Sequence, residues 1–373
     1  MNQPVLSHPD LGRRLRIGLI SSPMIFQAPG GVENKMRSTL AALQDKGVNA
    51  RFFDINKDLL RDFDVIHLFG TGSGNQRIVE WANDFGVPVV LSSVFSLPYS
   101  RFAGRRDRFL HGWVRRISRY DLNTTWGQFN SAFSGSARIV VLGDAESKAI
   151  TENFDVDPSI IRTIPNGIGE AFFNADPSVF LSAWTAQRPF ALMSGNISSA
   201  KNQLTAVRAI RDLDVDLVLF GSAGESQKSY LDACVSEGRG KVHYLGTRAL
   251  GDPYYASAFA AAAVTVLPSR TEVTPNVIME SLAAGTPAVC TSYNAWDRPF
   301  PSACYAEIDP ENIEDLRKSI MRFIENPPDQ ATCRTSVHHL RWPTIADRLI
   351  EVYSEACPRE QSVVAGSVGT QGH

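Results

Sequence analysis

Two glutamates that stand eight residues apart form the strongest chemical pattern in this sequence. Glu272 lies in a loop that follows an apolar run ending at Leu267, and Glu280 falls in the second turn of a predicted helix. Loop and helix can therefore place two carboxylates along one ligand. Carboxylates suit the paired hydroxyls of a sugar, as in ribose recognition by dinucleotide-binding folds. The alternative is that both are ordinary solvated carboxylates of a loop and a helix.

The start of that helix favours an anion. Thr274 suits the N-cap position, and Pro275 suits the first helical position. We then expect the backbone amides of Asn276 and Val277 to be free and to point beyond the end of the preceding strand. Free amides at a helix N-terminus are ready to bind a phosphate.

Lys201 is a second candidate for contact with an anion. We expect it in the first turn of a helix over 200–213, with Ser198 or Ser199 as the N-cap. A cation in that position opposes the helix dipole at a cost of roughly 0.3–1 kcal/mol, and an anion bound at the helix end removes the conflict. An exposed lysine that tolerates the small cost is the alternative.

Alternating strands and helices must position these side chains. Short apolar runs followed by helical periodicity predict parallel βαβ units, and the same rhythm starts again near residue 189. The predicted fold class is α/β, with two Rossmann-like, doubly wound parallel sheets facing a cleft. The expected strands are 15–20, 49–53, 64–69, 87–91, 138–142, 161–164, 189–194, 216–220, 242–245, 264–267, 288–291 and 305–308.

The predicted domain boundaries follow from the two runs of alternating strands and helices. The first domain is expected at 15–173 and the second at 189–340, with 174–188 as the connection between them. The polar stretch 1–14 and the Gly/Ser-rich stretch 358–373 are expected to lack fixed structure.

Composition excludes several function classes. The 373 residues carry 37 Lys and Arg against 39 Asp and Glu, a net charge of −2 that disfavours nucleic acid as the main partner. No apolar run approaches 18 residues, and the first 14 residues do not resemble a signal peptide. The five cysteines show no C-x-x-C spacing, so we expect reduced thiols in a cytoplasmic protein, with no disulfide framework and no zinc site.

Several motifs in fixed order resemble the family 4 retaining glycosyltransferases of GT-B fold, over about residues 16–353. The signature of that family is E-x7-E followed by a small-residue helix end, as in Glu272, Glu280 and Ala283-Ala-Gly-Thr-Pro287. The other similar motifs are Gly30-Gly31-Val32-Glu33, Asp64-Val-Ile-His67, Ile164-Pro-Asn-Gly-Ile168, Ser194-Gly195 to Lys201-Asn202, Phe220-Gly-Ser-Ala-Gly224 and Arg341-Trp-Pro343 to Tyr353.

The resemblance implies roles for these residues. Glu272 contacts the donor sugar and Glu280 the ribose, while Lys201 and backbone amides after Glu272 hold the diphosphate. The last helix, 341–357, crosses back to the first domain, which binds the acceptor. Such enzymes need neither a metal nor a cofactor. The donor-binding set is then Gly30, Gly31, Gly195, Asn196, Lys201, Arg270, Glu272, Thr274, Pro275, Asn276, Val277 and Glu280.

The sequence departs from the family pattern at two places. Asn196 stands where the family often has an arginine on the diphosphate, so either Asn196 donates a neutral hydrogen bond or Arg270 supplies the charge. The family also often has a histidine after the strand equivalent to 87–91. Here the acceptor-side candidates are Ser92, Ser93, Ser96 and His67, and a structural, hydrogen-bonded role for His67 is equally expected.

The resemblance implies a retaining hexosyltransferase that moves a hexose from GDP-mannose or a UDP-hexose to a hydroxyl of a glycan, a lipid-linked acceptor or a small molecule. Two alternatives remain open. One is a phosphorylase or nucleotide-sugar hydrolase of the same fold, and the other is a catalytically silent glycan-binding or scaffold subunit.

A basic stretch at 99–120 suggests a further partner. Seven arginines alternate there with Phe109, Leu110, Trp113 and other apolar residues, as in a basic amphipathic helix. Such a helix favours an anionic membrane surface or a lipid-diphosphate acceptor, which would place the protein at the inner face of the membrane. The alternative is that the apolar face packs on its own domain while the arginines meet water.

Overall fold

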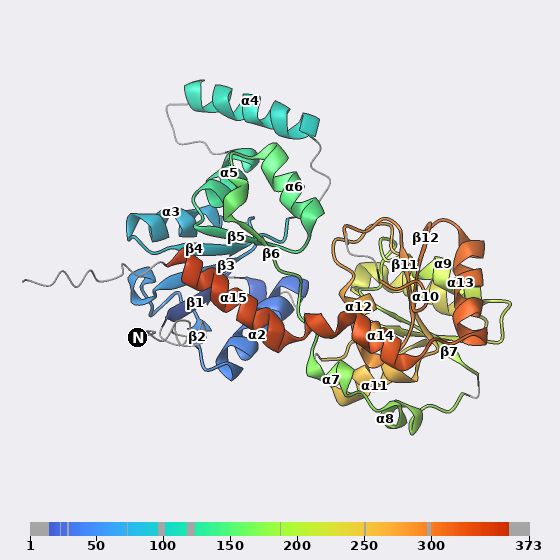
Figure 1. Cartoon of the computed structure of the whole chain (residues 1–373). Helices are drawn as coiled ribbons and strands as arrows, with labels where there is room; N and C mark the ends of the chain where they lie inside the picture. Colours follow the sequence, from blue (N-terminus) through green and yellow to red (C-terminus); the bar gives the residue numbers. More distant parts are fainter. Residues whose placement is uncertain are drawn as a thin grey trace, which may run out of the picture.

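The computed structural model describes residues 15–357 except 23, 28–29, 73, 96–100, 118–123, 187, 250 and 297–299. The stretches 1–14 and 358–373, which we expected to lack fixed structure, lie outside the described residues, as does Ser96. The described chain forms two α/β domains that lie side by side and meet at a narrow crossing (Figure 1). Within this part of the chain, no helix combines the length and the apolar character that crossing a bilayer requires.

The first domain contains a parallel sheet with the strand order β2-β1-β3-β4-β5-β6. The order reverses between β1 and β3, so the loops after these two strands diverge at one edge of the sheet. The strands are β1 Arg16–Ile20, β2 Asn49–Phe52, β3 Val65–Phe69, β4 Val89–Ser92, β5 Arg138–Val141 and β6 Ile161–Thr163. The helices are η1 Ile25–Gln27, α2 Gly31–Asp45, η2 Leu60–Asp62, α3 Gln76–Asp84, α4 Arg101–Ile117, α5 Thr125–Ser134, α6 Asp144–Asn153 and η3 Pro158–Ile160.

The second domain contains a parallel sheet with the order β12-β11-β10-β7-β8-β9, which reverses between β7 and β10. The strands are β7 Phe190–Ser194, β8 Asp216–Phe220, β9 Val242–Tyr244, β10 Val264–Leu267, β11 Ala288–Thr291 and β12 Tyr305–Ile308. The helices are α7 Glu170–Phe173, α8 Pro177–Leu181, α9 Gln203–Ile210, η4 Glu225–Gln227, α10 Lys228–Glu237, α11 Pro253–Ala261, α12 Asn276–Ala284, α13 Ile313–Glu325, α14 Gln330–Val337 and η5 His338–Leu340. The predicted two-sheet α/β fold is confirmed.

The last helix, α15 Trp342–Ala356, leaves the second domain and packs on the first (Figure 1). Its residues Ile345, Leu349 and Tyr353 belong to one buried cluster with Ile17 and Val65 of the first sheet. The core of the first domain therefore includes a segment that follows the whole second domain in sequence.

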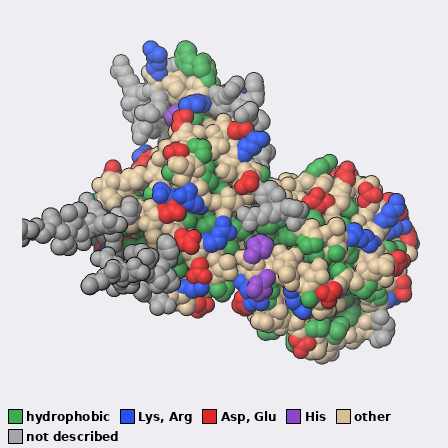
Figure 2. Space-filling view, viewed as in Figure 1, with side chains coloured by type: hydrophobic (Ala, Val, Ile, Leu, Met, Phe, Trp, Pro, Cys, Tyr) green, Lys and Arg blue, Asp and Glu red, His purple; other side chains and the backbone are tan. Residues whose placement is uncertain are grey.

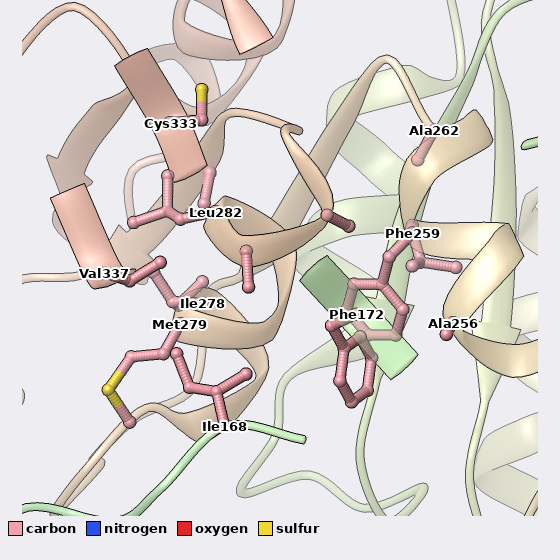
Figure 3. Packing of buried hydrophobic residues seen from close by; sticks show 14 of the residues in the cluster. Ile168, Phe172, Ala256, Phe259, Ala262, Ile278, Met279, Leu282, Cys333 and Val337 are labelled. Atoms are coloured by element: carbon pink, nitrogen blue, oxygen red, sulfur yellow. The ribbon is translucent and has the colours of Figure 1, made fainter. Parts of the chain in front are cut away.

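The segment 174–188, which we expected to be a connection only, is part of the second domain. It contains α8, whose Phe180 is fully buried in the cluster that also holds Phe172 and Phe259. Figure 3 shows this cluster, with Ile168 packed beside Met279 of α12. Aromatic side chains in this segment supply the apolar area that a solvated linker lacks, so the crossing between the domains lies nearer to residue 168 than we expected.

Candidate functional site

Lys201 and Glu272 meet at the strand reversal of the second sheet. Lys201 follows β7 and Glu272 follows β10, and these are the two strands between which the order reverses. The Lys201 Nζ atom lies 2.6 Å from Oε1 of Glu272. The side chain of Glu272 is 10% exposed and that of Lys201 is 30% exposed, so the pair is largely shielded from solvent but still reachable. Ligands bind at this position in open α/β sheets.

Asn202 fixes the position of this ion pair. Its backbone is left-handed, with φ +61°, and its side chain is buried. The Nδ2 atom donates hydrogen bonds to the carbonyl oxygens of Pro268, at 3.1 Å, and Pro310, at 3.0 Å. The amide of Arg270 also donates to the carbonyl of Ala200, at 2.9 Å. These bonds join the loop after β7 to the loops after β10 and β12, so they help to set the distance between Lys201 and Glu272.

Our expectation that Lys201 lies in the first turn of a helix is wrong. Helix α9 begins at Gln203, with Asn202 as its N-cap, so Lys201 lies in the turn before the helix. The left-handed conformation of Asn202 breaks the helical path, because consecutive helical residues need negative φ. Glu272 is the negative group that Lys201 contacts.

Two glycines bring the loops after β7 and β8 into contact. Gly195 and Gly221 both have positive φ, at +149° and +143°. A Cβ atom on Gly221 would lie 1.9 Å from the carbonyl oxygen of Gly195, which is too short for a non-bonded contact. Lys201 passes along Gly195, where a Cβ would lie 3.6 Å from its side chain. Beside it, Asn196 is exposed, and its carbonyl accepts a hydrogen bond from Gln203.

The N-terminus of α12 differs from our expectation in detail. Pro275 is the N-cap, and Thr274 makes no capping bond. The amide of Asn276 is not free, because it donates to the carbonyl of Thr274 at 2.9 Å. Pro275, with ψ +74°, turns the chain before the helix begins. Among the described residues, no backbone acceptor is found for the amide of Val277, so one donor of this helix end is left for a ligand or solvent.

Glu280 lies on α12 at the wall of a cavity of about 590 Å³ between the two domains. Burial raises the pKa of its carboxyl group to about 7. The cavity brings together three of the predicted residues, Gly31 from α2 of the first domain and Asn276 and Glu280 from α12 of the second. Asn276 also accepts a hydrogen bond from Asn166 at the crossing, at 3.1 Å. Gly30, the exposed N-cap of α2, precedes Gly31.

The acceptor-side candidates lie in the core instead of the cleft. His67 is fully buried, with Nδ1 2.7 Å from the Tyr353 hydroxyl of α15 and Nε2 2.9 Å from the Ser92 hydroxyl. Burial holds the pKa of His67 well below its ordinary value, so the ring is neutral at pH 7. Ser93 is also buried and donates to Glu146 at 2.5 Å. We therefore correct the expected acceptor role of His67, Ser92 and Ser93 to a structural one.

Arg270 does not approach the other donor-site residues with its side chain. Its guanidinium pairs with Glu311 at 3.3 Å, and both side chains are exposed. Sequence reasoning missed Lys35 of α2, which lines the interdomain cavity with Gly31 and Glu280. The spacing of about one helical turn places Lys35 on the same helix face as Gly31, and this signal could have identified it.

The aspartates near residues 62–64 and 212–216 do not gather into a metal site. Among the described residues, no group of three or more His, Cys, Asp or Glu is placed to hold a metal ion. Asp64 pairs with Arg16, and Asp214 and Asp216 pair with Arg188.

The basic stretch 99–120 contains α4, which lies away from the sheet beyond α5 and α6 (Figure 1). Phe109, Leu110 and Trp113 are 66%, 49% and 56% exposed. Figure 2 shows apolar and basic side chains together on this helix. The ring of His111 lies 5.4 Å from that of Trp126 of α5, in a tilted arrangement. Phe109, Leu110 and Trp113 therefore do not pack on their own domain as the alternative expected, whereas the side chains of Phe102 and Ile117 lie outside the described residues.

Comparison with known proteins supports the same fold. Residues 180–338 match the family Glycosyl transferases group 1. MMP alpha-(1->4)-mannosyltransferase of Mycolicibacterium hassiacum is 23% identical over 313 residues, which are 80% of this chain and 72% of that protein. A crystal structure of Anabaena Alr3699/HepE in complex with UDP superposes with a TM-score of 0.67 at 14% identity, over 91% of this chain and 100% of that one. Sucrose-phosphate synthase from Thermosynechococcus elongatus gives 0.66 at 17% identity, over 92% and 99%.

Proposed function

We propose that this chain is a glycosyltransferase that transfers a hexose from a nucleoside-diphosphate sugar to a hydroxyl group with retention. The match of residues 180–338 to the group 1 glycosyl transferases and the fold shared with solved glycosyltransferases support this proposal. The observation that carries this proposal is the arrangement of the interdomain cavity. Gly31 lines it from one domain and Asn276 and Glu280 from the other, and the ion pair of Lys201 and Glu272 lies at the strand reversal of the same second domain.

Each residue has a role that its surroundings support. Glu280 accepts hydrogen bonds from the ribose hydroxyls. Lys201 and the amide of Val277 contact the diphosphate, and Glu272 contacts the sugar while it keeps Lys201 in place. Donors aimed at the developing charge stabilise the transition state without a metal ion. We expect activity to persist in EDTA.

The reaction exchanges one bond for another at the anomeric carbon. The bond from this carbon to the diphosphate oxygen breaks, and the electron pair leaves with the diphosphate. The acceptor oxygen binds the anomeric carbon on the same face of the sugar, and its proton passes to the departing phosphate. Lys201 and the amide of Val277 lower the free energy of this step, because negative charge on the diphosphate rises as the bond breaks.

The donor sugar is a hexose carried by GDP or UDP. Similarity to a mannosyltransferase supports mannose, and the fold shared with a UDP complex is compatible with a UDP-hexose. Thermal shifts with UDP, GDP, ADP and dTDP, on wild type and on Glu280→Ala, distinguish them. A nucleotide at a hundredfold excess over its Kd stabilises the native protein by about 2.7 kcal/mol. We expect one nucleotide to give this shift and Glu280→Ala to lose it.

Product analysis separates the alternatives. A glycoside with the anomeric configuration of the donor, seen by NMR, supports retaining transfer to a glycan, lipid-linked or small-molecule acceptor. A sugar phosphate or free sugar identifies a phosphorylase or hydrolase. Nucleotide binding without turnover of any sugar donor identifies a silent binding subunit and contradicts the proposed enzyme.

We also propose that α4 binds an anionic membrane surface, so that the enzyme works as a peripheral protein at the inner face of the membrane. Phe109, Leu110 and Trp113 point outward beside the exposed Arg106 and Arg116, which suits an interface of acyl chains and anionic headgroups.

Sedimentation with vesicles tests this. We expect binding to phosphatidylcholine vesicles that contain phosphatidylglycerol and none without it. The double change Arg106→Ser and Arg116→Ser and the triple change of Phe109, Leu110 and Trp113 to Ser should each abolish it. The matched control changes Trp81 and Phe85, two exposed aromatic residues at α3, to Ser. Equal binding by all four proteins would contradict a role for α4.

A further inference from the structure

Lys35 is a cation in the wall of the interdomain cavity, and it has no ion-pair partner among the described residues. It lies on α2, one turn after Gly31, and lines the cavity together with Asn276 and Glu280. No described residue forms an ion pair with Lys35. Lys46, the other lysine that lines this cavity, pairs with Asp347 at 2.7 Å. Lys46 therefore already has an ion-pair partner, whereas Lys35 has none among the described residues.

The charge of Lys35 is compensated only in part: Asp45, Glu170 and Glu280 line the same cavity, but no ion pair joins any of them to Lys35 in the described part of the chain. Burial lowers the pKa of the ammonium group to about 8, and the carboxylate of Glu146 opposes this shift only in part. The oxygens of Glu146 already accept hydrogen bonds from the hydroxyl of Ser93 and the amides of Phe95 and Leu142. An ammonium group has three donors, and a buried charge without a partner carries a free-energy cost that an anion in the cavity removes.

The direction of the side chain agrees with an anion at the start of α2. Helix side chains point back toward the helix N-terminus, so Lys35 extends toward Gly31. The positive end of the helix dipole adds to its charge there. Across the cavity lies Glu280, which we have proposed as the ribose ligand, and no ion pair joins it to Lys35 in the described structure.

We propose that Lys35 binds a phosphoryl group in this cavity, an inference that rests on the proposed function. The family often has an arginine at the position of Asn196 to bind the diphosphate. Arg270 does not replace that charge in the cavity, because it pairs with Glu311 and does not line the cavity. The first domain then supplies the cation through Lys35. The phosphoryl group belongs to the donor diphosphate or to a phosphorylated acceptor, and both sources present the same chemistry.

Isothermal titration calorimetry on the full chain tests the assignment. The proteins are wild type, Lys35→Met, Lys35→Arg and the control Lys46→Met. The probes are inorganic pyrophosphate, the nucleoside diphosphate that stabilises wild type, the matching nucleoside, and glucose 6-phosphate added to protein saturated with that diphosphate. A charge-assisted bond predicts that Lys35→Met lowers affinity for phosphorylated probes roughly 10- to 100-fold. The nucleoside should bind all four proteins equally.

The outcomes are separable. Weaker pyrophosphate and diphosphate binding by Lys35→Met assigns the donor, and weaker glucose 6-phosphate binding alone assigns the acceptor. Lys35→Arg should keep most of the affinity, which a merely structural role of the lysine would not predict. Equal affinity of wild type and Lys35→Met for every phosphorylated probe overturns the inference. Failure of wild type to bind any nucleoside diphosphate contradicts the proposed function as well.

Discussion

The carboxyl group of Glu280 should make the unliganded protein less stable as pH rises. Burial raises its pKa from 4.5 to about 7, so the folded protein keeps this proton over a range in which the unfolded chain has lost it. Unfolding therefore becomes easier between pH 4.5 and pH 7, and below pH 4.5 the effect disappears. A difference of about 2.5 pKa units is worth about 3 kcal/mol above pH 7.

Replacing Glu280 with Gln removes this cost while it keeps the shape of the side chain. Linkage makes this cost about 1 kcal/mol at pH 5 and about 3 kcal/mol at pH 8, so the stability of the variant relative to wild type should rise by about 2 kcal/mol between these pH values. Urea unfolding of both proteins at each pH measures the gain. Glu237→Gln is a control of opposite sign, because pairing with Arg208 lowers the pKa of Glu237.

Nucleotide binding provides the second half of this test. Ribose hydroxyls that donate to Glu280 favour its charged form and lower its pKa, so binding at pH 7 should release part of a proton. Calorimetry in two buffers of different ionisation enthalpy counts the proton. A stability difference between wild type and Glu280→Gln that does not change with pH would refute the reasoning, and so would nucleotide binding without proton release.

Other predictions concern the loops at the strand reversal. Lys201→Met should lower kcat roughly 10²–10³-fold in a nucleotide-release assay, since it removes a cation from the departing diphosphate; a change below threefold would contradict that role. Asn202→Ala should lower the free energy of unfolding, measured in urea, by about 2–4 kcal/mol. Alanine loses two buried hydrogen bonds and tolerates the left-handed backbone less well than asparagine. A loss below about 1 kcal/mol would contradict the proposed role of Asn202. Gly221→Ala should weaken nucleotide binding at least about tenfold by calorimetry, as its Cβ collides with the Gly195 carbonyl, whereas Gly224→Ala, with open space around it, serves as the control.

Buried strands were the easiest elements to predict. The expected bounds of β8, β10, β11 and β12 agree with the structure, because parallel strands that are covered on both faces read as short apolar runs. Helices α5, α6 and α14 were not predicted. Their apolar residues are few and weakly periodic, and packing against neighbouring elements stabilises them, as the contact of α14 with α12 illustrates.

The glutamates of the candidate site could be predicted, but their partners could not. The spacing of Glu272 and Glu280 is visible in the sequence, whereas the ion pair joins Glu272 to a lysine 71 residues earlier. The sequence left the role of His67 open for the same reason. The hydroxyl that forms a hydrogen bond with its ring belongs to Tyr353, 286 residues away in the chain. Pairings at such separations depend on the tertiary fold, which local patterns do not record.

The return of α15 to the first domain has a consequence for biosynthesis. A ribosome completes residues 15–163, with all six strands of the first sheet, long before it reaches Tyr353, and the core of that sheet lacks one covering helix until then. The second domain is contiguous from Ile168 to Leu340, so it has all of its own core residues earlier. Domains generally fold as units during synthesis, so here the first domain to be made should be the last to finish folding. Its exposed apolar face during that interval is where a chaperone would bind.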